Sequence, residues 1–543
     1  MGEWTIGAVL DEIAQAVPDR VMTVCGDRRS TFAESARRTS RLAGYLTERG
    51  FGAHRERGDL RNWECGQDRI ALLMHNDLYP DMVIGCLKAR TVPVNVNHYY
   101  TSGEMAELLD YLRPRGVIYH RSLGAKFADN LAQAGVELLI SIDDGSEAPE
   151  LAGAVSLDDA LAAGADTDAP AGSPDDLLMI CTGGTTGRPK AVLWRQSDIY
   201  VSSMVGADHA DAAEIHQKVR DAGPPWFALS PLMHAAGMWT AFSAILSGQT
   251  VILYDTATGF DARTAWQTVE RERVGLMTMV GDAYAAPLVA ELGRLAGGGH
   301  DLSSLYAIGT GGAATNPKYQ AALLEYLPQL TLINGYGSSE TGNLGFGRSQ
   351  RDSRRDTFDL RDGGCVISRD RRRFLQPGDP EIGWSVRAGR IPLGYFDDES
   401  ATRGTFPDVE GRRVVVSGDR ASIDVDGTMR LFGRDALVVN TGGEKVFVEE
   451  VEEVLRAHPG VADALVVGRP SDRWGQELIA LVALVGSGGG SGVEALDEHC
   501  RKSLAGFKIP KEFVVVPEVR RLGNGKADYR WAKRQAEQKA VTL

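Results

Sequence analysis

The chain has 543 residues, of which 43% are hydrophobic and 24% charged, and its formal net charge is -14 at pH 7. This length and composition are typical of a globular protein of two or three domains with a large core. The acidic balance excludes a general nucleic-acid binder, because such a protein needs a clustered basic surface. No apolar stretch approaches the ~20 residues that span a bilayer, so membrane insertion is excluded as well.

The cysteines and the N-terminus place the protein in a cell compartment. The six cysteines have no C-x-x-C spacing and no histidine cluster nearby, which disfavours a zinc site or a disulfide framework. They are Cys25, Cys65, Cys86, Cys181, Cys365 and Cys500. The first residues, MGEWTI, lack the basic and apolar regions of a secretory signal. We therefore expect a cytoplasmic protein with reduced thiols.

Short apolar runs alternate with stretches of helical periodicity through about residue 430. The runs that we predict as strands are 69–75, 136–142, 177–182, 250–255, 275–281 and 330–337. Residues 102–113 and 317–327 repeat apolar residues at three- and four-residue steps, as amphipathic helices do. The pattern predicts an α/β fold in which crossover helices join buried parallel strands.

The last ~110 residues have a different pattern, which predicts a compact α+β module. A helix over 448–457 would carry one apolar face, formed by Val448, Val451, Val454 and Leu455. The other predicted elements are strands at 464–468, 477–485 and 513–516, a helix at 493–504 and a flexible surface loop at 486–492. We place the boundary near Gly433, between domains of residues 1–432 and 433–543.

The densest chemical signal is the sequence TGGTTGRPK at Thr182–Lys190, directly after the apolar run LLMIC. Its three glycines and three threonines allow backbone N–H groups and hydroxyls to converge on phosphate oxygens. It is not a Walker A loop, because Gly-Lys-Ser/Thr is absent. A plain flexible turn is the alternative, and the coincidence of glycines, hydroxyls and the Pro-Lys exit disfavours it.

Two further motifs suit a nucleotide. The sequence NGYGSSET at Asn334–Thr341 follows another apolar run. In it Tyr336 can stack on a base, Ser339 can reach a phosphate and Glu340 can hold Mg²⁺. Asp419, after the tight turn expected at Ser417-Gly418, could bind a ribose diol, although this signal is weak by itself.

In this order along the chain the motifs resemble those of the ANL superfamily of adenylate-forming enzymes. The superfamily contains acyl-CoA synthetases, peptide-synthetase adenylation domains and luciferases. The resemblance covers nearly the whole chain, and GGTTG, INGYGSSETG, NTGGEKV and GKADYRWAK are most similar to fatty-acid and steroid-acid CoA ligases of actinobacterial type. It implies a large N-terminal α/β domain with parallel sheets and a small mobile C-terminal α+β domain.

The resemblance also implies site residues. The implied catalytic residues are Lys526, Thr185 and His234. The implied nucleotide-binding residues are Thr182, Gly183, Gly184, Thr186, Gly187, Lys190, Gly311, Gly312, Ala313, Asn334, Gly335, Tyr336, Gly337, Ser338, Ser339, Asp419 and Arg434. CoA would contact Gly442, Gly443, Glu444, Trp474, Phe507 and Lys508, although Trp474 is also a candidate for the core. The hinge would be Asp435 and Ala436, the metal ligand Glu340, and the acyl pocket His234, Gly237, Gly281 and Gly311.

The implied reaction joins a carboxylic acid to ATP, releases pyrophosphate, and then transfers the acyl group from the adenylate to coenzyme A. A carboxylate and a phosphate repel each other, so Mg²⁺, loop amides, Thr185, Thr186 and Lys526 would lower the barrier electrostatically. The thiol then needs an open path with the lysine withdrawn. Rotation of the C-terminal domain about its hinge meets both demands. The small residues around the expected cavity favour a bulky hydrophobic acid of lipid, steroid or terpenoid type.

Three departures from the superfamily pattern suggest an alternative. Ala191 replaces a glycine and would add a methyl group beside the triphosphate path. Leu522-Gly523 replaces a proline and would loosen the lysine loop, and Ala436 replaces a polar hinge residue. The alternative is a ligase specialised for thioesterification, which takes its acyl-adenylate from a partner enzyme. A homodimer is also left open.

Two other functional classes compete. Residues 309–314 satisfy the G-x-G-x-x-A pattern of a dinucleotide-dependent oxidoreductase, but they lie mid-chain and lack the acidic residue expected about 20 positions later. A non-catalytic binding module would leave Lys526, Glu340 and Asp419 unexplained. Among the histidines only His234 lies in a motif, so we expect the other nine to be surface or structural residues.

Overall fold

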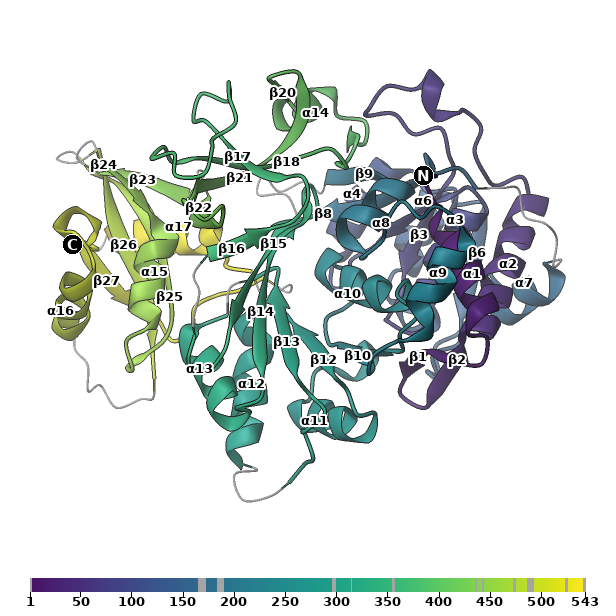
Figure 1. The fold of residues 1–543 in the computed structure, drawn as a ribbon, viewed down its shortest axis with the longest axis horizontal. Helices are drawn as coiled ribbons and strands as arrows, with labels where there is room; N and C mark the ends of the chain where they lie inside the picture. Colours follow the sequence, from purple (N-terminus) through teal and green to yellow (C-terminus); the bar gives the residue numbers. More distant parts are fainter. Residues whose placement is uncertain are drawn as a thin grey trace.

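The computed structural model describes residues 2–164, 172–182, 190–294, 299–313, 315–353, 357–434, 437–441, 444–471, 475–485, 493–522 and 526–540. Within these ranges the strands form sheets of 14, 8 and 5 strands. Figure 1 shows the five-stranded sheet at one end of the molecule, the eight-stranded sheet at the other and the largest sheet between them. The predicted loop at 486–492 lies outside the described residues.

The eight-stranded sheet has a parallel centre in the order β4-β3-β5-β6. Its strands are β3 (Arg69–Leu73), β4 (Val92–Asn95), β5 (Gly116–His120), β6 (Leu138–Ile142), β7 (Val155–Ser156), β8 (Leu177–Thr182), β9 (Lys190–Arg195) and β19 (Gly394–Tyr395). The helices of this part are α1 (Ile6–Ala16), α2 (Phe32–Glu48), α3 (Tyr79–Lys88), α4 (Ser102–Leu112), α5 (Arg121–Lys126), α6 (Ala128–Ala134), α7 (Leu157–Ala163), α8 (Gln196–Ser203) and α9 (Ala212–Arg220), with a short 3-10 turn, η1 (Arg57–Asp59). The central strands are buried on both faces, which explains their continuous apolar sequences.

The largest sheet begins as a parallel sheet and ends as an antiparallel one. Its parallel strands are β1 (Val21–Cys25), β10 (Trp226–Ala228), β11 (Val251–Leu253), β12 (Leu276–Met279), β13 (Ala307–Gly311) and β14 (Thr331–Ser338). They are connected through α10 (Ala235–Ile245), η2 (Thr256–Thr258), α11 (Ala262–Arg271), α12 (Gly281–Arg294) and α13 (Pro317–Tyr326). The antiparallel strands are β2 (Arg28–Thr31), β15 (Gly342–Ser349), β16 (Thr357–Leu360), β17 (Gly364–Ile367), β18 (Gly383–Ala388), β20 (Asp408–Val409), β21 (Arg412–Ile423) and β22 (Met429–Arg434), accompanied by α14 (Glu399–Thr405).

The five-stranded sheet and its helices form the C-terminal part of the chain. The strands are β23 (Val438–Thr441), β24 (Glu444–Phe447), β25 (Val461–Ser471), β26 (Gly475–Leu484) and β27 (Glu512–Val515). The helices are α15 (Val448–Arg456), α16 (Val493–Ser503), η4 (Gly506–Lys508) and α17 (Tyr529–Ala540). The predicted apolar face of α15 is confirmed, since Val448, Val451 and Leu455 are buried and Val454 packs against the same core.

The α/β architecture predicted from the apolar runs is confirmed, and each predicted strand and helix has a counterpart. The prediction of parallel strands fails after β14, because a short connection to β15 can only produce an antiparallel pair. Gly337 is required there, because a Cβ atom would collide with the carbonyl oxygen of Gly342. The chain leaves the largest sheet at Arg434 and enters the five-stranded sheet at Val438, close to the boundary that we predict at Gly433.

All six cysteines are free thiols. Over the part of the chain that the structure describes, we find no helix that is both long and apolar enough to cross a membrane.

Candidate active site

His234 lies in the segment between β10 and α10, where it occupies the N-cap position of the helix. The side chain is partly buried, and its buried Nε2 atom has no hydrogen-bond partner among the described residues. Burial lowers the pKa of His234 to about 4, and the positive charge of Lys526 contributes to the same shift. His234 is therefore a neutral imidazole at neutral pH, and Lys526 of the C-terminal part lies near it.

Two buried asparagines that the sequence analysis missed hold this segment in place. Asn76, after β3, donates to the carbonyl oxygens of Tyr254 (2.9 Å) and Ser230 (3.4 Å) and accepts from the N–H of Leu232 (2.7 Å). Asn95, at the end of β4, donates to the carbonyl oxygen of Met233 at 2.6 Å. Both follow apolar runs, and the rule that ligands bind beyond the carboxyl ends of parallel strands could have singled them out.

The structure brings together two of the predicted nucleotide residues, Tyr336 and Asp419. The Tyr336 hydroxyl donates to Asp419 Oδ2 at 2.7 Å, and burial together with this carboxylate raises the pKa of Tyr336 well above its ordinary value. Asp419 on β21 pairs in register with Arg434 on β22. The tight turn expected before Asp419 is wrong. Residues 412–423 form one strand, in which Gly418 alone takes a left-handed conformation at φ +85°.

The predicted adenine wall also forms one surface. Gly311 on β13 is the parallel partner of Gly335 on β14, and the neighbouring pair in register is Thr310 with Asn334. A Cβ at Gly311 would lie 3.1 Å from the Gly335 carbonyl oxygen. A glycine at this position therefore avoids a tight contact between the two neighbouring strands. The remaining members continue the same strands and turns; they are Gly312, Ala313, Gly337, Ser338 and Ser339.

Glu340 follows β14 and is held by a tyrosine that the sequence analysis did not single out. Tyr395 on β19 donates its hydroxyl hydrogen bond to Glu340 Oε1 at 3.0 Å. Lys190, at the start of β9, places its Nζ 4.8 Å from the Tyr395 ring centroid and 3.9 Å from Asp398 Oδ2. Trp194, also on β9, donates to the carbonyl oxygen of Ser339 at 2.8 Å. The eight-stranded sheet therefore positions the expected metal-binding loop of the larger sheet.

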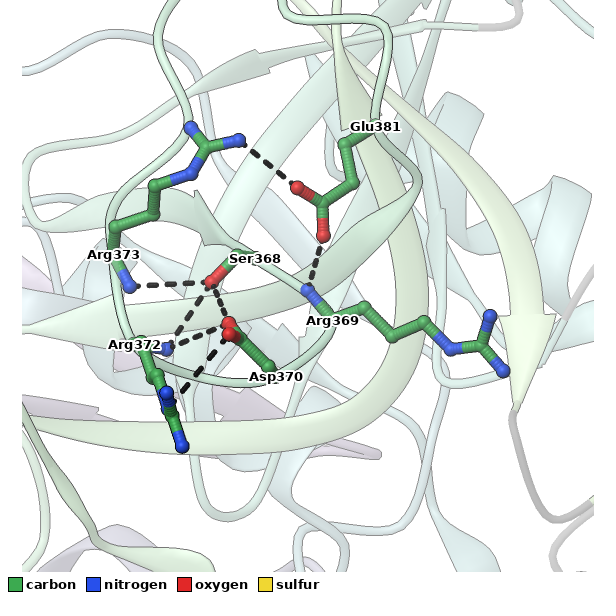
Figure 2. A pocket seen from close by; sticks show the side chains of 6 residues that line it. All are labelled: Ser368, Arg369, Asp370, Arg372, Arg373 and Glu381. Atoms are coloured by element: carbon green, nitrogen blue, oxygen red, sulfur yellow. Dashed lines mark hydrogen bonds and ion pairs between the residues drawn. The ribbon is translucent and has the colours of Figure 1, made fainter.

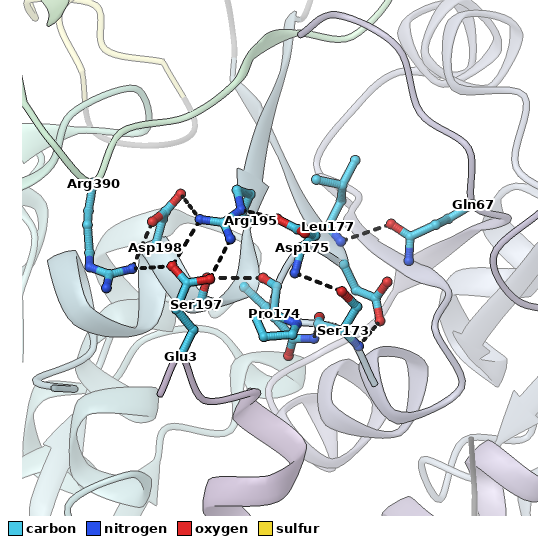
Figure 3. Close-up of polar contacts among 12 residues, drawn as sticks. Glu3, Gln67, Ser173, Pro174, Asp175, Leu177, Arg195, Ser197, Asp198 and Arg390 are labelled. Atoms are coloured by element: carbon cyan, nitrogen blue, oxygen red, sulfur yellow. Dashed lines mark hydrogen bonds and ion pairs between the residues drawn. The ribbon is translucent and has the colours of Figure 1, made fainter. Parts of the chain in front are cut away.

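The far end of β9 is anchored by a charge network that includes the first residues of the chain (Figure 3). Arg195 pairs with Glu3 at 2.6 Å and with Asp198 at 3.1 Å. Arg390 pairs with Asp198 at 3.0 Å and with Asp208 at 2.6 Å. The half-buried guanidinium groups thus each meet more than one carboxylate, which fixes the strand that carries Lys190.

The expectation for Ala191 is wrong. Its side chain is fully buried in the hydrophobic cluster that contains Met179, Leu193 and Phe396. Successive side chains of a strand point to opposite faces, so the face that carries Lys190 does not carry Ala191. The Ala191 methyl group therefore lies in the core and not beside the triphosphate path.

The glycines of the expected acyl pocket have structural reasons of their own. A Cβ at Gly237 would lie 2.7 Å from the Pro231 carbonyl oxygen, so this glycine is explained by the close packing of α10. Gly281, the first residue of α12, has φ +58°, and Gly312 has φ +79°. Both values lie in the left-handed region that glycine adopts without strain.

Lys526 is exposed at the end of a short excursion from the five-stranded sheet. The N–H of Leu522 donates to the carbonyl oxygen of Lys526 at 2.8 Å, across the base of the loop that we expected Leu522-Gly523 to loosen. Gly523 itself lies outside the described residues. Arg521 pairs with Asp463 at 2.7 Å and anchors the same loop to β25. On the predicted CoA side, Phe507 is 38% exposed and Lys508 pairs with Glu450 at 2.7 Å.

Several expected site residues lie outside the described residues. They are Gly183, Gly184, Thr185, Thr186, Gly187, Asp435, Ala436, Gly442, Gly443 and Trp474. The same holds for the side chains of Thr182, Arg434 and Glu444.

An open pocket of about 600 Å³ lies in the loop region between β17 and β18 (Figure 2). It is lined by Ser368, Arg369, Asp370, Arg372, Arg373 and Glu381. Arg373 pairs with Asp379 at 2.7 Å and with Glu381 at 3.0 Å, so its charge is compensated within the loop. The pocket shares no residue with the site described above.

Comparisons with known proteins identify the family of the chain. Residues 10–360 match the AMP-binding enzyme family and residues 450–526 match its C-terminal domain. The medium-chain acyl-CoA ligase Mig of Mycobacterium avium is 41% identical over 546 residues, covering 98% of each chain. The 3-oxocholest-4-en-26-oate–CoA ligase of Rhodococcus rhodochrous is 31% identical over 547 residues, covering 98% of this chain and 95% of its own.

The fold agrees with solved structures. The anthranilate CoA ligase AuaEII, in complex with anthranoyl-AMP, superimposes with a TM-score of 0.81 at 20% identity, covering 100% of this chain and 98% of its own. The o-succinylbenzoate CoA synthetase of Bacillus subtilis gives a TM-score of 0.76 at 22% identity, covering 99% of each chain. The resemblance inferred from the motifs is thereby confirmed: the chain belongs to the AMP-binding enzyme family of adenylate-forming enzymes.

Proposed function

We propose that this chain is an AMP-forming acid–CoA ligase that converts a hydrophobic carboxylic acid to its acyl-adenylate and then to its CoA thioester. The observation that carries the proposal is the match to the AMP-binding enzyme family and to its C-terminal domain. The positive charge of Lys526, in that C-terminal part, also contributes to lowering the pKa of His234 in the expected acyl pocket. That arrangement suits the first half-reaction, in which two anions must approach each other.

Each residue of the site has a role in this proposal. Lys526 contributes a compact positive charge between the carboxylate and the α-phosphate. Neutral His234 borders the reacting carboxylate and adds no charge that would compete with the lysine. Asp419, held by Tyr336, accepts hydrogen bonds from the ribose hydroxyls. Rotation of the C-terminal part then withdraws Lys526 and admits the thiol.

The donor set fits Mg²⁺ held mainly by the nucleotide. In the described ranges no group of three or more His, Cys, Asp or Glu side chains is arranged to hold a metal ion. Glu340 supplies one carboxylate, and Mg²⁺ usually takes one or two carboxylates together with phosphate oxygens and waters. When bound, Mg²⁺ would neutralise phosphate charge. The Tyr395 hydroxyl, bonded to Glu340, would hold the carboxylate that binds the metal in a fixed orientation.

The relatives named above act, by their names, on medium-chain acyl groups and on 3-oxocholest-4-en-26-oate. A further relative from Mycobacterium marinum, 35% identical over 551 residues, is named for medium- and long-chain fatty acids and the same steroid acid. We therefore place the substrate among fatty acids and steroid side-chain acids. The free thiols of the six cysteines suit a cytoplasmic enzyme.

The alternative is a ligase that only thioesterifies an adenylate supplied by a partner enzyme. Two of its three supports are weakened, because Ala191 lies in the core and a backbone hydrogen bond closes the lysine loop. The third, Ala436, lies outside the described residues. We therefore favour the complete ligase. A homodimer stays a proposal with no bearing on this choice.

The test is a screen of fatty and steroid acids with MgATP, with and without CoA. Pyrophosphate release that depends on the acid, and formation of acyl-CoA detected by mass spectrometry, are the expected results. Single-turnover rates for acid plus MgATP are then compared with those for synthetic acyl-adenylate plus CoA. Fast thioesterification with no adenylation from any acid would instead support the specialised ligase.

A further inference from the structure

Three histidines outside any motif meet at the carboxyl ends of adjacent parallel strands. His75 follows β3, His98 follows β4 and His120 ends β5, and these strands are neighbours in the order β4-β3-β5. The ring centroids of His75 and His98 are 5.0 Å apart, and those of His75 and His120 are 5.4 Å apart. This edge of a parallel sheet is where open α/β folds bind ligands.

The hydrogen bond of His98 determines which of its nitrogens can accept. Its Nδ1 lies 3.3 Å from the carbonyl oxygen of Met74, and a carbonyl can only accept, so Nδ1 carries the hydrogen. Burial lowers the pKa of His98 to about 4, so the ring is neutral at neutral pH. In a neutral ring with hydrogen on Nδ1, Nε2 is an acceptor.

That acceptor is buried and unmatched. His98 is 4% exposed, and its Nε2 has no hydrogen-bond partner within the described ranges. A buried polar atom without a partner is uncommon in native proteins and carries a free-energy cost. A bound molecule that donates a hydrogen bond would remove that cost.

His98 is connected to the expected acyl pocket through the end of β4. Asn95, three residues earlier, is bonded to Met233, the residue before His234. A positive charge on His234 would also lower the pKa of His98. The ring centroids of His98 and Tyr99 lie 4.5 Å apart in an edge-type contact. His98 therefore follows a strand end that is hydrogen-bonded to the His234 segment.

We propose that His98 Nε2 accepts a hydrogen bond from a hydroxyl group on the acyl chain, so that the preferred substrates are hydroxylated hydrophobic acids. This inference rests on the proposed ligase function and adds the substrate class to it. An unsubstituted chain would leave Nε2 without a donor, whereas a hydroxyl at the right depth supplies one. Sites that bind a substrate hydroxyl discriminate strongly against the analogue that lacks it.

The experiment measures kcat/KM for acyl-CoA formation with decanoic acid and with its hydroxylated positional isomers. The wild-type enzyme should prefer one isomer over decanoic acid. His98→Leu should lower that preference by about tenfold, because it removes the acceptor, while ATP–pyrophosphate exchange with decanoic acid stays within about threefold of wild type. His98→Gln retains an acceptor oxygen and should keep most of the preference. Tyr99→Phe, a neighbouring control that leaves Nε2 in place, should keep all of it.

The outcomes separate this inference from the function on which it rests. Exchange with decanoic acid but no preference for any hydroxylated isomer would mean that Nε2 binds only a water, and would overturn the inference alone. Equal losses for both acids in His98→Leu, with no recovery in His98→Gln, would indicate a purely structural histidine and would also overturn it. Failure of every acid to support exchange would overturn the ligase function itself.

Discussion

The two segments that meet at the active site are held in opposite ways. The segment carrying His234 is bonded to Asn76 and Asn95, two buried side chains from the neighbouring sheet. The loop carrying Lys526 is closed by its own backbone and by Arg521, within the C-terminal part. The difference fits our proposal that the wall of the acyl site is built before any ligand binds, whereas the lysine is carried by a part that moves as a unit.

The strongest test of this comparison removes the positive charge of Lys526. Lys526→Ala should lower adenylate formation from acid and MgATP by about a thousandfold, as expected for loss of a charge that acts on the transition state. Thioesterification of a synthetic acyl-adenylate should stay near the wild-type rate, because the lysine has left the site by then. Single-turnover kinetics measure both steps, with Lys533→Ala on the exposed face of α17 as the control. Equal losses in both half-reactions would contradict the proposal that rotation of the C-terminal part moves Lys526 into and out of the site.

A second test concerns the segment around His234 that Asn76 holds in place. Asn76→Ala should destabilise the protein by about 3 kcal/mol, since it leaves the buried N–H of Leu232 without its acceptor and two carbonyl groups without their donor. Thermal unfolding followed by circular dichroism measures the loss. Asn97→Ala is the matched control, because the Asn97 side chain accepts from the local N–H of Tyr99. An effect no larger than that of the control would mean that the asparagine does not hold the wall.

A third test concerns the link between the two sheets at Glu340. Tyr395→Phe removes the hydroxyl that bonds to Glu340 and should lower kcat/KM for MgATP by about tenfold, the equivalent of one hydrogen bond to a charged group. Raising the Mg²⁺ concentration should restore part of the loss. Tyr111→Phe is the control, since its hydroxyl bonds to Phe396 and not to Glu340. A loss that Mg²⁺ does not change would argue against a role in metal binding.

The smallest expected effect comes from the contact between the two parts. Lys318 on α13 donates to the carbonyl oxygens of Val461 (3.2 Å) and Ala462 (3.3 Å) across that contact. Lys318→Met should reduce adenylation relative to thioesterification by about two- to threefold, because one partly buried hydrogen bond contributes roughly 0.5 kcal/mol. The ratio of the two single-turnover rates is the measurement, with Lys533→Met as the control. A ratio that does not move would show that this contact does not bias the orientation.

Most secondary structure could be predicted because it depends on local pattern. Buried strands such as β3 and β12 are nearly continuous apolar runs, and the stripe on α15 follows helical spacing. The antiparallel half of the largest sheet could not be predicted, since apolar runs of similar composition pair in either direction. The length of the connection between two strands determines whether they pair parallel or antiparallel. Ala191 shows the same limit at one residue, because a motif position does not reveal which face of its strand the side chain occupies.

The sequence by itself determined the family and predicted which loops carry the chemistry, because phosphate, metal and ribose binding each need residue types that cluster within a few positions. Only the tertiary structure decided what holds those loops in place. Asn76 and Leu232 are 156 positions apart, and Asn95 and Met233 are 138 apart. Tyr395 likewise bonds to Glu340, which lies 55 positions earlier. A hydrogen bond between residues at the ends of two strands depends on the order and register of the strands in the sheet. A local sequence pattern contains no information on either, so these partners could be identified only from the tertiary structure.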